Sequence, residues 1–454
     1  MPARKADLTG RLARYMAAAR TRALPERVVV AAKQRIVDTL AAIVSGARLS
    51  PGKVAIDYVR ALGGTAEACV ATTSIVTTAV NAAFANAMCA HADETDDFHP
   101  FTKAHPGCSV VPAAFAMAER ERAPGAALIA AVALGYDIGC RLLMALGPDA
   151  VRASEQSAEG VSSTFGAAAA AASVAGFDEH RMRYAISYAA QQTSGVWSWD
   201  RDEEHIEKAF DFAGMGARNG VMGATMIQAG FTGVADALDA VPNVFRAHSP
   251  RPSPEELVAN LGATFYVEET AIKTFPVGYP IQAPLEAFLS LAKQHALNVD
   301  NVRRIVVRLP ADGARIVDNS AMPDVNVQHI IAVALVDGGI TFESSHARER
   351  LTDPRVLAVR SRVELVADTA LVDAAAPRSG LVEVTTSDGR RVSQFVKHAR
   401  GTPENPLDTD GVNAKARELI VPVLGAQRTD ALLERIGALE RVADVRELRP
   451  LLAA

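Results

Sequence analysis

The sequence contains few cysteines and no recognisable cysteine motif. The four cysteines among its 454 residues are Cys69, Cys89, Cys108 and Cys140, and no two of them form a CxxC pair. Their number and spacing are not typical of a disulfide framework and favour reduced thiols in a cytoplasmic protein. The opening stretch MPARKADLTGRLARYMAAARTRAL has basic residues throughout and no uninterrupted apolar core. We therefore expect no signal peptide and a cytoplasmic location.

An excess of positive charge is also missing. The chain has 47 Lys and Arg residues against 52 Asp and Glu residues, a formal net charge of −5. Because binding to phosphate backbones needs a basic face, we expect no nucleic-acid partner. A small anionic substrate remains compatible, since it needs only a local positive pocket. No GxGxxG or GxxxxGK[ST] run is present, which argues against a dinucleotide site or a phosphate-binding loop.

Long runs of strongly apolar residues are absent as well. The run that most resembles a membrane span, residues 160–177, is short and consists mostly of Ala, Ser, Thr and Gly. Such small residues suit close packing of helices in a core better than contact with lipid. The hydrophobic content of 49% and charged content of 22% are ordinary for a soluble globular protein. We expect no membrane partner.

Two kinds of pattern divide the chain. Residues 1–240 predict Ala-rich helices, for example AAKQRIVDTLAAIVSGA, whose apolar residues fall on one helical face. After the Pro/Ser-rich stretch HSPRPSPEE, strands are predicted for VRRIVVRLP and SRVELVAD, with a hairpin around Asp388-Gly389 and helices over residues 283–295 and 327–337. The helical pattern returns from Gly411 onward.

This order predicts a mainly α protein with an α+β component. We expect a large all-helical domain made of residues 1–265 and 405–454. A smaller α+β domain, residues 266–404, is expected to be inserted between these two segments.

A dense cluster of titratable groups follows a stretch without charge. Residues 76–90 contain no charged side chain, whereas residues 91–119, HADETDDFHPFTKAHPGCSVVPAAFAMAE, contain three histidines and five acids. A helix over residues 79–97 would place His91, Glu94 and Asp97 on one face. His105 would then lie on the loop that follows. A carboxylate at a helix end opposite a loop histidine is a plausible general acid–base pair.

Two other interpretations of the cluster remain open at this point. It could be a solvated helix end whose acids cap nearby amides. It could also be a metal site built from His91, Glu94 and Asp97, as in a metal-dependent hydrolase. Because no HExxH or other dedicated spacing is present, we expect no metal.

Several motifs in this order resemble the MmgE/PrpD family. They are AAKQRIVDTLAAIVSG, HADETDD…HPGCSVVPAAFAMAE, GYDIGCRL, TFGAAAAAASVAGF, QQTSG, K…AGMGARNGVMGATMIQAGFTG, IKTFPVGYP and QHIIAVALVDG. The family contains 2-methylcitrate dehydratase, cis-aconitate decarboxylase and iminodisuccinate epimerase. The resemblance implies a helical domain with an inserted α+β domain, an active site in the cleft between them, and a homodimer.

The resemblance also implies an activity and its residues. The activity is that of a cofactor-independent lyase on a small di- or tricarboxylate, similar to 2-methylcitrate dehydratase. The candidate catalytic residues are His105, Glu94, Lys208 and His329, and the candidate substrate-binding residues are Lys273, Asp97 and Gln282. Of these, His105 would move a proton, the two lysines would hold carboxylates, and Glu94 would orient His105 or act as a base with a raised pKa. His329 would be the acid on the opposite face.

Six positions depart from the family pattern. Glu94 is a longer carboxylate than the acid of the family's D-x-D-D pattern, and His329 stands where the family has tyrosine. Phe98 stands where the family has threonine, and histidines are replaced at or near Ser157, Asp211 and Gln282. The sequence therefore leaves the substrate open. An epimerase or isomerase of the same family and a catalytically dead binding protein are the alternatives. Trp197 and Trp199, the only tryptophans, are expected to form part of a rim over the pocket.

Overall fold

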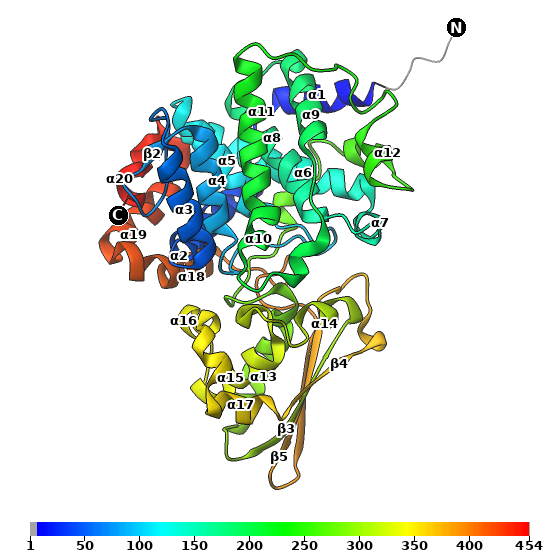
Figure 1. Ribbon diagram of the computed structural model, residues 1–454, viewed down its shortest axis with the longest axis vertical. Helices are drawn as coiled ribbons and strands as arrows, with labels where there is room; N and C mark the ends of the chain where they lie inside the picture. The colour runs from blue at the N-terminus through cyan, green and yellow to red at the C-terminus, as the bar shows by residue number, and fades with distance from the viewer. Residues whose placement is uncertain (1–6, 454) are drawn as a thin grey trace.

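The computed structural model describes residues 7–453, and its fold is mainly α with one small α+β part. Figure 1 shows a helical part above and a part that contains the sheet below. The red helices of the C-terminal tail lie beside the blue helices of the N-terminal region. The predicted fold class is therefore confirmed.

The helical part is built from twelve N-terminal and three C-terminal helices within the described residues. The first twelve are α1 (Leu8–Ala18), α2 (Glu26–Gly46), α3 (Ser50–Leu62), α4 (Ala79–Ala90), α5 (Gly107–Arg120), α6 (Gly125–Leu146), α7 (Pro148–Ala153), α8 (Ala158–Val174), α9 (Glu179–Gln192), α10 (Ile206–Ala209), α11 (Met215–Gln228) and α12 (Val244–His248). A short π-helical turn, Phe210–Gly214, joins α10 to α11. The tail contributes α18 (Thr409–Leu424), α19 (Ala426–Gly437) and α20 (Arg449–Leu452), and a two-stranded ribbon, β1 (Ala68–Cys69) with β2 (Val76–Thr77), precedes α4.

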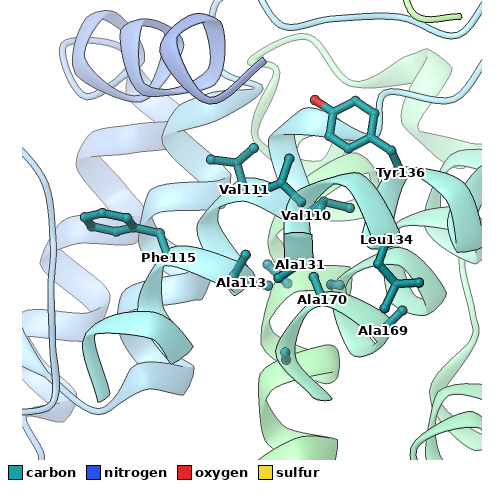
Figure 2. Close-up of a cluster of buried hydrophobic side chains, with 14 of the residues drawn as sticks. Val110, Val111, Ala113, Phe115, Ala131, Leu134, Tyr136, Ala169 and Ala170 are labelled. Atoms are coloured by element: carbon teal, nitrogen blue, oxygen red, sulfur yellow. The ribbon is translucent and has the colours of Figure 1, made fainter. Parts of the chain in front are cut away.

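Small residues let α5, α6 and α8 pack closely. A Cβ atom added at Gly135 of α6 would lie 2.5 Å from a Val110 methyl group and 2.9 Å from the Gly166 carbonyl oxygen of α8. Figure 2 shows the side chains of Val110 and Ala170 within this cluster. Helix α6 is long and apolar enough to cross a membrane by length and composition alone, but it is almost entirely buried inside the helical part. Its hydrophobicity is therefore explained by the core.

The α+β part packs helices against a four-stranded sheet. Its elements are α13 (Gln282–His295), β3 (Val302–Leu309), α14 (Ala311–Val317), α15 (Val327–Asp337), α16 (Phe342–His346), α17 (Pro354–Arg360), β4 (Val363–Ala367), β5 (Gly380–Thr386) and β6 (Arg391–Val396). The strand order is β4-β3-β5-β6, with β3 and β4 parallel and the other pairs antiparallel. The predicted hairpin is confirmed, since Gly389 takes the left-handed conformation, φ 84°, between β5 and β6.

Two large hydrophobic cores and two small clusters are present within residues 7–453, and the tail helices share the largest core. Val412 and Ile420 of α18 belong to the same buried cluster as Ile36 of α2, whereas a second cluster lies between α13, α15 and the sheet. The backbone N–H of Ile272 donates to the carbonyl of Gly401 at 2.9 Å, so the segments leading into and out of the α+β part lie side by side. The boundaries 265/266 and 404/405 stay a prediction.

The predicted helix over residues 79–97 is wrong at its C-terminal end. Helix α4 ends at Ala90, and the residues from His91 to Asp97 form a loop. The Asp93 carboxylate accepts hydrogen bonds from the Thr95 backbone N–H at 3.0 Å and from the Thr95 hydroxyl at 2.6 Å. Such local bonds compete with helical ones, and Glu94 takes the left-handed conformation, φ 54°. His91, Glu94 and Asp97 therefore do not lie on one face of a helix.

Candidate active site

A cavity of about 350 Å³ lies between the helical and α+β parts. The helical part contributes Glu94, Phe98, Lys103, His105, Asp149, Arg152, Ala153, Glu159, Trp197, Trp199, Lys208 and Phe212 to its wall. The α+β part contributes Gly278, Tyr279, Pro280, Asp312, Arg315, Ile316, Val325 and Arg378. Its size falls within the range of small-molecule sites, and its wall combines aromatic rings with positive charges.

Glu94 is the centre of the charge network beneath this cavity. Its carboxylate accepts hydrogen bonds from the Lys208 ammonium and, at 2.8 Å, from the Lys273 ammonium. All three side chains are buried. Burial alone would raise the pKa of Glu94, but the two lysine charges outweigh it and hold the pKa well below its ordinary value. Glu94 is therefore an ionised anchor for lysines rather than a base with a raised pKa.

Asp96 is a second buried carboxylate of this network, and it contacts two histidines and one lysine. It lies 2.8 Å from Nδ1 of His91 and 3.0 Å from Nδ1 of His105, and it accepts a hydrogen bond from Lys273 at 3.2 Å. Burial would raise the pKa of Asp96, but His91 and Lys273 outweigh it and lower the pKa well below its ordinary value. With Nδ1–H of His105 donated to a carboxylate, Nε2 is the nitrogen left for a ligand. His105 lines the cavity, so it is placed for proton transfer.

The structure brings together four of the seven predicted site residues. Glu94, His105 and Lys208 line the cavity, and Lys273 lies directly behind Glu94 with 1% of its surface exposed. Lys208 and Lys273 come from distant parts of the chain, as expected for a site that only folding assembles. These contacts support the prediction but do not test catalysis.

The other three predicted residues do not line the cavity. The Asp97 carboxylate accepts the Gly107 backbone N–H at 2.9 Å, and burial raises its pKa to about 6. The side chain of Gln282 is bonded to the backbone of residues 274–277. His329 is buried in α15, where burial lowers its pKa to about 4. Asp97 and Gln282 thus bind backbone groups, whereas neither ring nitrogen of His329 makes a hydrogen bond within residues 7–453.

Several cations of the cavity were missed by the sequence analysis. Arg152, Arg315 and Arg378 line the wall, and Arg315 lies 5.0 Å from the centre of the Trp197 ring. Lys103 and Arg378 both contact Asp312 at 2.8 Å, whereas Arg315 has no acidic partner within residues 7–453. Each arginine lies in a short segment whose local pattern is that of a solvated surface, so no sequence signal marks it. Both tryptophans line the cavity, as predicted for a rim.

The carboxylates and histidines form two groups whose geometry could hold a cation. Within residues 7–453 these are His91, Asp96 and His105, and His91, Glu94 and His205; the trio considered as an alternative metal site, His91, Glu94 and Asp97, is not brought together. In both groups the carboxylate already binds a lysine ammonium. A metal ion would have to displace these ammonium groups, so the donor set fits lysine cations better than a metal.

Two of the departures from the family pattern contact each other. The Ser157 hydroxyl donates to the Asp211 carboxylate, and both side chains are buried. Burial raises the pKa of Asp211 to about 8. A third departure, Phe98, lines the cavity and stacks on Tyr279 with ring centres 3.9 Å apart. Of these three departures, Phe98 lies on the cavity wall, and the Ser157 hydroxyl lies 3.4 Å from Glu159, which also lines it.

Comparisons with known proteins agree with this architecture. The N-terminal domain model of the MmgE/PrpD family matches residues 10–257, and its C-terminal domain model matches residues 275–439. Cis-aconitate decarboxylase of Homo sapiens is 25% identical over 452 residues, which cover 94% of this chain and 91% of the relative. Cis-aconitate decarboxylase of Aspergillus terreus (strain NIH 2624 / FGSC A1156) is 24% identical over 400 residues, 82% of this chain and 81% of the relative. The chain belongs to the MmgE/PrpD family, as the order of its motifs predicted.

Proposed function

We propose that this enzyme is a lyase that releases CO₂ from a small tricarboxylate without a metal or an organic cofactor. The observation that carries the proposal is the buried Glu94–Lys208–Lys273 cluster beside His105 on the cavity wall. The relatives named as cis-aconitate decarboxylases identify the enzyme class as lyase and favour decarboxylation over dehydration. The arginines of the cavity supply the positive charge that a substrate with several carboxylates needs.

The proposed chemistry has two steps. The bond between a carboxylate carbon and its neighbouring carbon breaks, CO₂ leaves, and the electron pair stays on the substrate as a carbanion. Lys208 and the cavity arginines stabilise the carboxylates that remain. The imidazolium form of His105, held by Asp96, then donates its Nε2 proton to the carbanion and regains a proton from water. Asp96 supports this step because its contact with Nδ1 fixes the orientation of the ring.

The proposal predicts a specific isotope pattern. Purified protein incubated with cis-aconitate in D₂O should release one CO₂ per substrate, and the product should carry one deuterium on the newly protonated carbon. Mass spectrometry of the product and of the released gas measures both. Citrate and a dicarboxylate serve as comparison substrates. Gain or loss of water without CO₂ would identify a dehydratase, and deuterium exchange without net turnover would identify an epimerase; either result would overturn the decarboxylase.

Independence from metal gives a second prediction. Because both carboxylates of the candidate cation groups bind lysine ammonium groups, the purified protein should contain no stoichiometric zinc, iron or manganese. Elemental analysis measures the content, and activity should survive treatment with a chelator. One tightly bound ion per chain, lost together with activity, would contradict the prediction.

We also propose that the protein is a cytoplasmic homodimer. An apolar face on α3 supports the dimer, because Val54, Tyr58 and Leu62 are 46%, 56% and 53% exposed. Exposed apolar side chains gathered on one helix are typical of interaction surfaces. Light scattering after size-exclusion chromatography should give twice the mass of one chain. A monomer at micromolar concentration would contradict this proposal.

A further inference from the structure

A buried chain of acids and imidazoles crosses from the α+β part to the active site. The imidazole of His205, in the helical part, lies between two carboxylates. Its Nε2 is 3.6 Å from Glu94 Oε1, and its Nδ1 is 3.6 Å from Oδ2 of Asp324, which follows α14 in the α+β part. The exposed fractions of Glu94, His205 and Asp324 are 2%, 6% and 3%. None of these three residues was linked to another by the sequence.

The α+β part contacts the helical part near these side chains at further points. Nε2 of His346, at the end of α16, lies 3.6 Å from Asp324 Oδ2 and donates to the backbone carbonyl of Asp93 at 3.0 Å. Arg348 donates to the Glu203 carbonyl at 2.6 Å. The α+β part therefore contacts the residues next to Glu94 on one side and the segment that carries His205 on the other.

The backbone at both ends of the His205–Glu94 contact is strained. Glu94 has φ 54° and His205 has φ 65°, the left-handed region that side chains other than glycine rarely adopt. Such a residue persists only where the surroundings fix it, most often at functional sites. His205 Nε2 and Asp324 Oδ2 also make no hydrogen bond within normal distance in the described part of the chain. The surrounding structure therefore holds His205 in this conformation, with its ring facing both carboxylates.

The charges explain what His205 contributes. Burial alone would raise the pKa of Asp324, but the nearby imidazoles of His205 and His346 outweigh it and lower the pKa. Nε2 of His205 faces Oε1 of Glu94, and its Nδ1 faces Oδ2 of Asp324. Lys273 contacts the other oxygen of Glu94, Oε2. Lys208 lies three residues after His205 and donates to the same carboxylate.

We propose that His205 and Asp324 form a positioning pair that transmits docking of the α+β part to Glu94, and through Glu94 to Lys208. The pair touches neither the cavity nor the substrate, because neither residue lines the cavity wall. Its role is to fix the carboxylate that orients the cavity lysine. The kinetic test of this inference rests on the proposed lyase activity. A second test measures the chemical reactivity of Lys208 and needs no substrate.

The kinetic test uses His205→Gln, Asp324→Asn and the double variant, with thermal unfolding as a check on folding. A misplaced catalytic group costs up to about 10²-fold, so kcat should fall by about 10- to 100-fold while the affinity for a tricarboxylate stays within about threefold. Because the two residues act through one contact, the double variant should lose no more than the worse single variant. Additive losses, or single variants with parental kcat, would overturn the proposal.

A control variant distinguishes an effect of this pair from a general loss of contact between the two parts. A second measurement tests the pair without relying on the proposed lyase activity. Arg348→Ala removes a neighbouring contact between the two parts without touching the pair, and it should leave kcat unchanged. Acetic anhydride labelling of Lys208, read by mass spectrometry, should rise several-fold in the two single variants but not in Arg348→Ala, because a displaced Glu94 no longer binds and covers the Lys208 nitrogen. If the parent turns over no tricarboxylate, the lyase proposal fails. The labelling of Lys208 still tests the positioning role of His205 and Asp324. Unchanged labelling would overturn it.

Discussion

Replacing His105 with alanine should remove turnover while sparing ligand binding. His105 lines the cavity with Nδ1 held by Asp96, so the variant loses the group assigned to proton transfer but keeps the cavity cations. Loss of a general acid or base typically costs about 10²–10⁴-fold in rate. The measurement is kcat from CO₂ release, together with the affinity for a tricarboxylate by calorimetry. His180→Ala, on the exposed surface of α9, is the control and should behave as the parent.

The result that would contradict this prediction is equally specific. A His105→Ala enzyme with kcat within about threefold of the parent would fall far outside the expected range and would end the acid–base role of this loop. A large loss of ligand affinity at unchanged kcat would instead make His105 a binding residue.

Replacing Lys273 with methionine should strongly destabilise the helical part. Lys273 is buried between Glu94 and Asp96, so its removal leaves two buried carboxylates with one fewer counter-charge. Breaking a buried ion pair from one side typically costs about 3–5 kcal/mol. Urea unfolding at pH 7 measures the loss. Lys397→Met, which removes only an exposed contact with Asp373, is the control and should leave the unfolding free energy nearly unchanged.

The loss should depend on pH in one direction. The pKa of Glu94 in the folded state lies below its ordinary value of 4.5, so its contribution to stability is present above that pH and is lost as the pH falls through the folded-state pKa. Without Lys273 the buried carboxylates protonate more readily. The difference between parent and variant should therefore be largest near neutral pH and shrink toward acid. A difference that grows on acidification would contradict the charge argument.

The sequence predicted those elements whose signals are local. Helix α15 begins and ends where its pattern placed it, at Val327 and Asp337, and the hairpin turns at Asp388-Gly389. The helix through residues 91–97 was wrong because the side chain of Asp93 captures local donors that the apolar pattern does not reveal. Residues 91–97 do contribute Glu94 to the cavity wall, but they do not form the helix that the sequence predicted.

The cavity itself could be predicted only in part. The resemblance led to Glu94, His105, Lys208 and Lys273, which the structure assembles. Arg315 could not be found, because its place opposite Trp197 depends on how the α+β part docks on the helical part. His205 was hidden for the same reason, since its partner Asp324 is more than a hundred residues away in the chain.

The α+β part begins and ends at neighbouring points of the chain, where Ile272 is bonded to Gly401. A unit attached in this way can be exchanged or altered by evolution without changing how the helical part folds. It carries Arg315 and Arg378, while Glu94, His105 and Lys208 stay in the helical part. In the proposed mechanism, part of the positive charge that binds the substrate therefore lies in a different segment of the chain from the proton-transfer group. Changes confined to the α+β segment could alter the cavity wall without altering His105.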